Sequence, residues 1–533
     1  MKTPVGALAA SVRALVEQQS LLRPEAVYAL ATESGATLSY RSLAASCLQV
    51  TALLRSHGVA ACDTVSLVMP NGLMTLRLLL GTLHGGSCVN PVNLLSQPEQ
   101  MHYVLEHSDC KLVFTTPEWA PRVRALLATI ERPVLLIDVD ADASELPVPA
   151  KSDIDTVIVT DTGTETPGAV AAEPAPAPDS VALLMYTSGT TGRPKGVMLS
   201  QANLVANARA IAAEHALTPA DRVLSVLPLY HINAFAVTML APLASGGSLA
   251  IAPRFSSARF WAQAADTQCT WLNVVPTIVS YLLEGQDPPA ALAGRWRFCR
   301  SASAALPPEH LRAFERRFGV DIIETMGLTE TVAPCFSNPL DPAQRKLGAV
   351  GRASGCEARV IDAELHPVPD GSTGELAVRG PNVMLGYYRN PQATAAAFTP
   401  DGWLRSGDLG HRDADGFYFV TGRIKELIIK GGENIAPREI DEALLKHPAV
   451  LDAAAVGIPD PHYGQEILVC VVLRASPLPD ETEADRMRAE LLKFCEHHLG
   501  RFKTPKRICF LSELPRGPSG KVQRLQLPAL AGS

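Results

Sequence analysis

The chain has 533 residues, of which 47% are hydrophobic and 19% are charged. This length exceeds what one hydrophobic core usually serves, so we expect at least two globular domains, and the composition excludes a disordered chain. The net charge of −7 argues against a nucleic-acid partner, because binding a phosphate backbone requires a broad basic face.

The first twenty residues carry charges at Arg13 and Glu17, which interrupt any apolar run of signal-peptide length. This stretch is therefore predicted to form an amphipathic helix. No run of about 18 uncharged apolar residues predicts a membrane span. The 11 cysteines include no CxxC pair, which favours free thiols in a reducing compartment over a disulfide framework or a zinc site. These features predict a cytoplasmic protein.

Short apolar runs then alternate with helical patterns, such as the helix predicted at 41–58, which a glycine ends. A segment rich in Pro, Ala, Thr and Glu at 160–180 is predicted to be a solvated linker. This rhythm predicts an α/β fold with mainly parallel sheets. The short apolar runs before the linker include 65–69 and 134–138, and the strands predicted after it are 181–186, 222–229, 247–252, 269–275 and 320–326, which are expected to be buried.

The pattern changes from about residue 348, where short runs between Gly, Pro and Asp turns predict a small antiparallel barrel or sheet. These runs are 357–362, 374–380 and 416–423. From Ile424 onward a strand, a loop and a helix follow, with Pro437 suited to the first helical turn. We therefore predict an N-terminal domain at 1–423 and a smaller C-terminal domain at 424–533.

The segment "YTSGTTGRPKG" at 186–196 is unusually dense in glycine and in hydrogen-bond donors. Glycines permit close backbone approach to an anion, and the hydroxyls and the Lys195 ammonium can donate to phosphate oxygens. The Walker pattern GxxxxGK[ST] is absent, since Gly196 and Val197 follow the lysine. The alternative interpretation is an ordinary surface loop.

Four further stretches carry polar or charged residues beside glycines, and they are "GLTE" (327–330), "SGDLG" (406–410), "GRIKELIIKGGENIAPREIDEAL" (422–444) and "PSGK" (518–521). Each has a structural alternative, because Thr329–Glu330 could cap a helix, Asp408 could stabilise a turn and Lys521 could be solvated. Together and in this order they resemble the adenylate-forming superfamily, which includes acyl-CoA synthetases, aryl-CoA ligases, luciferases and peptide-synthetase adenylation domains. The resemblance runs from about residue 38 to 524.

The resemblance implies a large N-terminal domain, with layered α/β parts and a small antiparallel barrel, and a small mobile α+β C-terminal domain. It implies an AMP-forming acid–thiol ligase that uses ATP, Mg²⁺ and CoA. The residues implied to hold the ATP phosphates are Thr187, Ser188, Gly189, Thr190, Thr191 and Lys195. Thr329 is implied to contact the α-phosphate and Glu330 to bind Mg²⁺.

Further roles are implied by the same resemblance. Met326 and Gly327 lie at the adenine, where the family usually has an aromatic residue in place of Met326. Asp408 and Arg423 are assigned to the ribose, and Lys521 is the catalytic lysine of adenylate formation. Lys425 matches the hinge of the mobile domain. The residues implied to face the CoA tunnel are Lys430, Gly431 and Gly432.

The acyl pocket of the family is built from segments that here contain polar side chains. These candidate substrate-binding residues are His231, Asn233, Asn273, Arg300, Ser301 and Ser303. An amino-acid substrate would need an acidic residue within 227–235, which is absent, and a long fatty acid would need a uniformly apolar pocket. His231 is also selected as a candidate catalytic residue, with gating of the thiol tunnel as its alternative role, and Arg300 could instead point away from the pocket into a salt bridge.

Three stretches, 240–261, 295–319 and 422–441, look most similar to oxalyl-CoA synthetases and related ligases, among which a sulfoacetate–CoA ligase is similar in kind. Serines and a basic residue suit a second anionic group, so we predict a small dianionic acid, oxalate or sulfoacetate. Asn233 replaces a histidine usual in the oxalate enzymes, which leaves room for a sulfonate.

One alternative is a short-chain or aromatic monocarboxylate ligase. A second, a non-catalytic nucleotide-binding module, predicts loss of Lys521, Glu330 or Asp408, and all three are present. The expected partners are a small acid, ATP and CoA, and a homodimer stays an open prediction.

Overall fold

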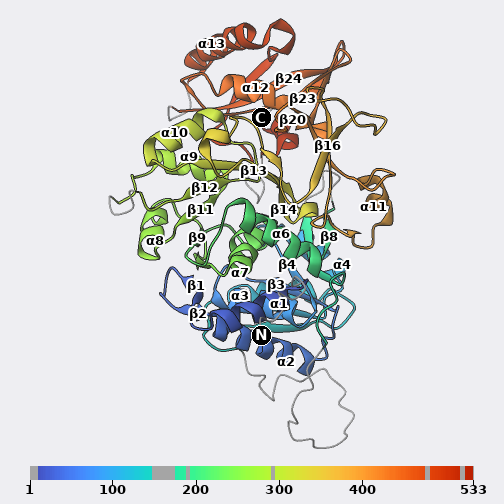
Figure 1. Ribbon diagram of the computed structural model, residues 1–533. Coiled ribbons are helices and arrows are strands. Elements are labelled where there is room, and N and C mark those ends of the chain that lie inside the picture. The colour runs from blue at the N-terminus through green and yellow to red at the C-terminus, as the bar shows by residue number, and fades with distance from the viewer. Residues whose placement is uncertain are drawn as a thin grey trace, which may run out of the picture. The chain divides into compact units, whose positions relative to one another are not determined.

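The computed structural model describes residues 10–146, 174–187, 193–289, 294–474, 480–516 and 522–531. Helices lie against strands along most of the chain, so the predicted mixed α/β class is confirmed (Figure 1). Most of the predicted linker at 160–180 falls on 147–173, outside the described residues. The chain divides into two compact units, Met1–Asn273 with Thr329–Ala333 and Pro381–Ala393, and Val274–Leu328 with Pro334–Gly380 and Thr394–Ser533.

The first unit contains a seven-stranded sheet. In spatial order its strands are β18 (Gly386–Tyr387), β8 (Lys195–Ser200), β7 (Val181–Thr187), β4 (Cys88–Pro91), β3 (Thr64–Val68), β5 (Leu112–Thr115) and β6 (Leu135–Asp138). The strands from β7 to β6 pair in parallel, whereas β8 pairs antiparallel with both β7 and β18. Every residue of β3 and β5 is buried, as expected of parallel strands covered on both faces.

A second group of paired strands belongs to the same unit. In spatial order it comprises β11 (Trp271–Val274), β9 (Arg222–Ser225), β10 (Ser248–Ile251), β1 (Val27–Ala31) and β2 (Thr37–Ser39). The pairs are parallel except for the antiparallel pair of β1 and β2. The strands predicted within the first 275 residues are thus confirmed as β3, β6, β7, β9, β10 and β11, although no residue of β6 is fully buried.

Helices surround these strands in the first unit. They are α1 (Val12–Leu22), α2 (Tyr40–Ser56), α3 (Leu73–His84), α4 (Pro98–His107), α5 (Ala120–Leu127), α6 (Gln201–Glu214), α7 (Ala241–Ser245) and α8 (Phe260–Asp266). The predicted helix at 41–58 is α2, and the predicted N-terminal amphipathic helix is α1. Gly81 allows α3 to pack closely on α2, because a Cβ at this position would lie 2.5 Å from the Cβ of Val50.

The second unit begins with another α/β segment. Its elements are α9 (Pro276–Glu284), β12 (Phe298–Ser301), α10 (Pro308–Phe318), β13 (Ile322–Leu328), β14 (Ala333–Ser337) and β15 (Arg352–Ala353). β12 and β13 pair in parallel, and β14 and β15 pair antiparallel. The predicted strand at 320–326 is confirmed as β13, although it extends two residues further.

A four-stranded antiparallel sheet follows in the second unit. Its order is β16 (Glu357–Ile361), β17 (Gly374–Arg379), β19 (Leu404–Arg412) and β20 (Tyr418–Arg423), and α11 (Pro391–Ala397) precedes β19 in the chain. The predicted antiparallel runs are confirmed as β16, β17 and β20. β19 was not predicted, because its polar, glycine-containing sequence "LRSGDLGHR" lacks the alternation of a half-buried strand.

The C-terminal part of the second unit forms a five-stranded sheet with helices. It comprises β21 (Ile428–Lys430), β22 (Glu433–Ile435), α12 (Pro437–Leu444), β23 (Val450–Asp460), β24 (Gly464–Leu473), α13 (Glu481–Leu499), β25 (Arg507–Phe510) and α14 (Leu527–Leu530). Pro437 occupies the first turn of α12, as predicted. Its core joins Ile440 of α12, Val469 of β24 and Leu491 of α13. The domain boundary at residue 423 stays a prediction.

Candidate active site

The two ends of the glycine-rich segment are held as a β-hairpin. Thr187 at the end of β7 pairs with Lys195 at the start of β8, and Tyr186 pairs with Gly196. The four predicted phosphate-loop residues Ser188, Gly189, Thr190 and Thr191 lie outside the described residues. The sheet therefore fixes both points at which this loop begins and ends.

The base of this hairpin contacts α4 through aromatic side chains. The hydroxyl of Tyr186 lies 2.7 Å from Nδ1 of His107, and the two rings meet edge to face. Tyr388 makes a similar edge contact with His107. Burial and the nearby Arg389 guanidinium lower the pKa of His107, which favours a neutral ring at neutral pH. These contacts stabilise the position from which the loop departs.

The "GLTE" motif ends in a 3-10 turn at Thr329–Thr331. Within the first unit, Glu330 accepts a hydrogen bond at 2.8 Å from the hydroxyl of Tyr387 to its Oε1. The Lys195 ammonium lies over the Tyr387 ring, 4.8 Å from its centroid. One tyrosine thus contacts both the lysine of the glycine-rich segment and the carboxylate predicted to bind Mg²⁺.

Backbone pairing brings Tyr387 to this position from far along the chain. Strand β18 pairs antiparallel with β8, which sets Tyr387 opposite Val197. Just before this strand, the amide of Met384 donates a hydrogen bond of 2.8 Å to the carbonyl of Glu330. Tyr387 was not among the predicted site residues, although it lies in "LGYYRNP", where two tyrosines follow a glycine.

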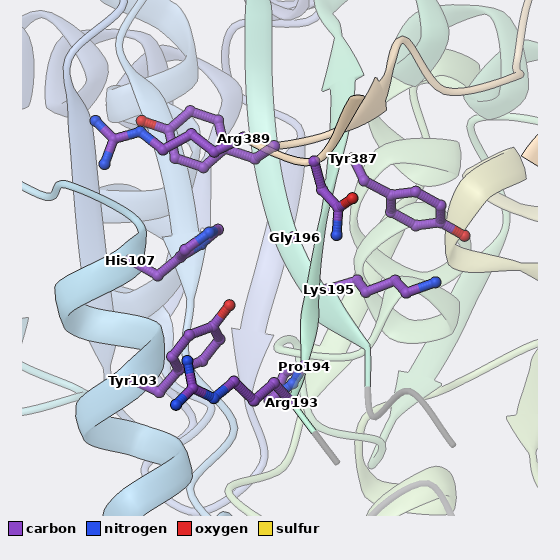
Figure 2. A pocket seen from close by; sticks show the side chains of 10 residues that line it. Tyr103, His107, Arg193, Pro194, Lys195, Gly196, Tyr387 and Arg389 are labelled. Carbon is purple, nitrogen blue, oxygen red and sulfur yellow. The ribbon is translucent and has the colours of Figure 1, made fainter. Parts of the chain in front are cut away.

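A pocket of about 460 Å³ lies beside the hairpin and within the first unit. Its walls include Tyr103, His107, Arg193, Lys195, Tyr387 and Arg389. Figure 2 shows Arg193 beside Tyr103 of α4, whereas Lys195 extends in another direction, below Tyr387. The basic side chains of this pocket do not converge on one point, since Arg193 and Lys195 diverge and Arg389 pairs with Asp109 at 3.1 Å.

Glu330 fits the predicted role of a magnesium ligand. Its Oε2 has no hydrogen-bond partner among the residues that the structure describes, so a hard carboxylate oxygen is available. The described part of the chain contains no group of three His, Cys, Asp or Glu side chains suited to hold a metal ion. Mg²⁺ commonly binds through one or two carboxylates together with substrate phosphates, so a single glutamate is a sufficient protein ligand.

In the second unit, Asp408 and Arg423 face each other on neighbouring strands of the antiparallel sheet. They are register partners on β19 and β20, and Nε of Arg423 lies 2.7 Å from Oδ1 of Asp408. Gly407, with φ of 72°, turns the chain here, and its amide donates to buried Glu375 at 2.9 Å. The Asp408 amide donates to the hydroxyl of Ser406 at 3.0 Å. Contact of this pair with a ribose stays a prediction.

Met326 and Gly327 lie half-buried near the end of β13. Glu324, on the same strand, is buried and accepts a hydrogen bond of 3.4 Å from the amide of Leu306. Burial raises the pKa of Glu324 to about 7, although the Arg438 guanidinium opposes the shift. Sequence reasoning did not select Glu324, because a carboxylate within an apolar strand shows its environment only after folding.

The candidate acyl-binding residues of the first unit form a polar patch in a buried setting. Nδ2 of Asn273 lies 3.4 Å from Oδ1 of Asn233, and both residues are buried. His231 is half-buried and its ring meets that of Tyr230 at an angle of 63°. The structure therefore brings Asn233 and Asn273 together.

The candidate acyl-binding residues of the second unit lie on β12 and just after it. Arg300 is 1% exposed and Ser301 is 2% exposed. Burial lowers the pKa of Arg300 to about 9. Among the described residues the Ser301 hydroxyl has no hydrogen-bond partner. Ser303 follows in the left-handed region, with φ of 75°. Arg300 and Ser301 are consecutive residues of β12, so their side chains point to opposite faces of the sheet. A buried guanidinium such as that of Arg300 can bind an anionic group.

Lys430, which the resemblance places at the CoA tunnel, is buried within the second unit. Its ammonium lies 2.9 Å from Oε2 of Glu466, and both side chains are 8% exposed. The rings of Tyr463 and Phe502 lie 5.5 and 5.2 Å from the same nitrogen. In this structure Lys430 packs the hairpin of β21 and β22, and a contact with CoA stays a prediction.

The remaining predicted residues near the hinge and tunnel lie on turns. Lys425 lies in a short 3-10 turn at Ile424–Glu426. Gly431 and Gly432 form the turn between β21 and β22, with φ of 57° and 84°. Lys521, predicted to be catalytic, lies outside the described residues.

Two further predictions concern the whole chain. All 11 cysteines are free, which confirms the expectation that they form no disulfide framework. In the described part of the chain, no helix has both the length and the apolar character needed to cross a membrane.

The pattern of the AMP-binding enzyme family matches residues 16–388, and that of the AMP-binding enzyme C-terminal domain matches residues 439–521. The chain therefore belongs to the AMP-binding enzyme family, and the predicted adenylate-forming class is confirmed. It is 53% identical to a sulfoacetate–CoA ligase from Cupriavidus necator over 519 residues, which cover 97% of each chain.

Two other relatives extend the comparison. The chain is 35% identical to an oxalate–CoA ligase from Arabidopsis thaliana over 479 residues, which cover 89% of each chain. Among solved structures it resembles ATP-bound MatB from Rhodopseudomonas palustris, with a TM-score of 0.85 and 29% identity. That match covers 98% of this chain and 99% of the other. The predicted fold is thereby confirmed over nearly the whole length.

Proposed function

We propose that this enzyme is an AMP-forming carboxylate–CoA ligase for a small acid with a second anionic group, and that sulfoacetate is its substrate. The observation that supports this proposal is the burial of the cationic Arg300 side chain on β12, which is 1% exposed. A buried cation is stabilised by an anion that brings hydrogen-bond acceptors, and a sulfonate offers three.

The choice between the two dianions rests on similarity and on one residue. The Cupriavidus necator relative named for sulfoacetate is 53% identical, whereas the Arabidopsis thaliana relative named for oxalate is 35% identical. Asn233, hydrogen-bonded to Asn273, can donate to a sulfonate oxygen without carrying charge. We therefore favour sulfoacetate over oxalate.

The first half-reaction would join the acid to AMP. A carboxylate oxygen of the acid attacks the α-phosphorus of ATP, and the bond to the β-phosphate oxygen breaks, which releases pyrophosphate. The protein contributes positioning and charge stabilisation in such a transfer. Lys195 and the loop beginning at Thr187 would hold the β- and γ-phosphates. Thr329 would contact the α-phosphate, and Asp408 with Arg423 would hold the ribose.

Magnesium, held by Glu330 and the phosphates, would neutralise phosphate charge. Lys521 would stabilise the negative charge that grows on the α-phosphate.

In the second half-reaction the CoA sulfur attacks the acyl carbon, AMP leaves with the bridging oxygen, and the thiol proton is lost. Because Lys521 would obstruct a thiol, we propose that residues 424–533 rotate at Lys425 between the two steps. A cytoplasmic location fits substrates such as ATP and CoA and the free cysteines.

A pyrophosphate-release assay with separate acids tests this proposal. The panel contains sulfoacetate, oxalate, malonate, propionate, benzoate and octanoate, each with ATP, Mg²⁺ and CoA. We expect the highest kcat/KM with sulfoacetate. Preference for benzoate or octanoate would refute the dianion assignment, and no release with any acid would refute the activity.

A further inference from the structure

The phenol of Tyr387 connects two groups that the proposed reaction uses. Its hydroxyl donates to Oε1 of Glu330 at 2.8 Å, and the face of its ring contacts the Lys195 ammonium, which lies 4.8 Å from the ring centroid. Figure 2 shows Lys195 and Tyr387 extending together on one side of the hairpin. Burial and the Glu330 carboxylate raise the pKa of Tyr387, so the hydroxyl keeps its proton at neutral pH.

The backbone holds this tyrosine from two sides. Its own strand β18 pairs with β8, which begins at Lys195, so the ring and the lysine are set on adjacent strands. The chain just before it binds the "GLTE" turn, since the Met384 amide donates to the Glu330 carbonyl at 2.8 Å. The phenol is thus fixed relative to both of its contacts.

We propose that Tyr387 is a positioning residue that orients the Glu330 carboxylate for magnesium and supports the Lys195 ammonium for phosphate. This inference rests on the proposed function of the same site. Because Oε1 is engaged by the phenol, Oε2 is the oxygen directed to the ion. A hydrogen bond from outside the coordination shell fixes the orientation of a carboxylate ligand. The aromatic face stabilises the ammonium by a cation–π contact.

The hydroxyl and the ring have separable roles. Tyr387→Phe removes the hydrogen bond to Glu330 but keeps an aromatic ring against the Lys195 ammonium. Tyr387→Leu removes both. We therefore expect the phenylalanine variant to lose metal affinity alone and the leucine variant to lose affinity for the nucleotide phosphates as well.

The test measures Mn²⁺ binding by electron paramagnetic resonance, using the full-length enzyme with α,β-methylene-ATP, which cannot release pyrophosphate. We expect Tyr387→Phe to weaken Mn²⁺ binding about 10- to 100-fold, the usual effect of losing a partner of a metal ligand. Affinity for the analogue without metal should match that of the wild type. A separate measurement with Tyr387→Leu should show weaker binding of the metal-free analogue.

Tyr28→Phe is the matched control, because Tyr28 is buried in the same unit and its hydroxyl donates to the Met239 carbonyl at 2.9 Å. This control should lower the melting temperature without changing Mn²⁺ affinity. The inference would be overturned if Tyr387→Phe bound Mn²⁺ as tightly as the wild type does. It would also be overturned if Tyr387→Phe and Tyr28→Phe lost the same amount of Mn²⁺ affinity. Failure of the wild type itself to bind Mn²⁺ with the analogue would instead refute the proposed function.

Discussion

A guanidinium inside a protein loses its hydration, and Arg300 shows the effect in a pKa lowered to about 9. An incoming anion restores part of the lost stabilisation, whereas an uncharged methyl group cannot. The same side chain that costs solvation in the free enzyme can therefore select a dianion over a monocarboxylate of similar size.

Arg300→Met should lower kcat/KM for sulfoacetate by about tenfold to a hundredfold, the range for one hydrogen bond to a charged group. The value for propionate should change little, since its methyl end needs no cation. Steady-state kinetics with both acids check this, and Arg295→Met, at an exposed position, is the control. A parallel loss with both acids would contradict a role in substrate choice.

The lowered pKa of Arg300 also predicts a pH dependence. The cationic form binds the sulfonate, and it is lost as the pH rises through about 9. Because kcat/KM reports the free enzyme, its value for sulfoacetate should fall above that pH, whereas the value for propionate should not. Rate profiles between pH 7 and pH 10 with both acids check this, and identical profiles would contradict it.

Glu324 gives a pH dependence of stability. Its pKa is raised by burial from 4.5 to about 7, so the folded state binds the proton more tightly than the unfolded state. The stabilisation is complete below the unfolded value and is lost as the pH rises through about 7. Glu324→Gln should therefore gain melting temperature relative to the wild type as the pH increases from 5 to 8. A difference that is independent of pH would contradict this assignment.

At the scale of elements, the hairpin of β21 and β22 depends on one buried ion pair. Glu466→Gln would leave the Lys430 ammonium buried without its carboxylate, which should destabilise this sheet by about 3 to 5 kcal/mol. Hydrogen exchange of the β24 amides measures that loss. Glu439→Gln, which breaks the more exposed pair with Lys503, is the control and should cost about 1 kcal/mol or less. Similar losses in both variants would contradict a special role of burial.

Elements were predictable where local pattern decides them. The run at 65–69 is apolar except for Ser66 and lies mostly within β3, and Pro437 marked the start of α12. β18 has only two residues, and its partner β8 lies far back in the chain, so no local pattern reveals it. For that reason Tyr387 was not predicted, although Glu330 and Lys195, which its side chain contacts, were both selected.

At the scale of the whole molecule, some features follow from the sequence and others exist only in the folded chain. The order of the motifs predicted the family and the fold, because it is a property of the sequence alone. The environment of Arg300 and Glu324 depends on which strands surround them, and burial exists only in the folded chain. The sequence alone left two positions open for the Arg300 side chain, in the acyl pocket or in a salt bridge.

If the C-terminal residues 424–533 rotate between the two half-reactions, one substitution should impair the first half-reaction and spare the second. Lys521→Ala should reduce adenylate formation, measured by ATP–pyrophosphate exchange, by about two orders of magnitude or more, as expected when a group stabilising transition-state charge is removed. Thioester formation from supplied acyl-adenylate should be largely retained, since residues 424–533 would then have rotated. Equal loss in both half-reactions would contradict the rotation.

The most direct test of the central claim is the identity of the products. The purified enzyme is given ATP, Mg²⁺, CoA and an equimolar mixture of sulfoacetate, oxalate, propionate, benzoate and octanoate, and the thioesters are identified by mass spectrometry. The proposed function predicts sulfoacetyl-CoA as the main thioester, with AMP and pyrophosphate formed in equal amounts. A predominance of propionyl-, benzoyl- or octanoyl-CoA, or the formation of ADP and phosphate, would contradict it.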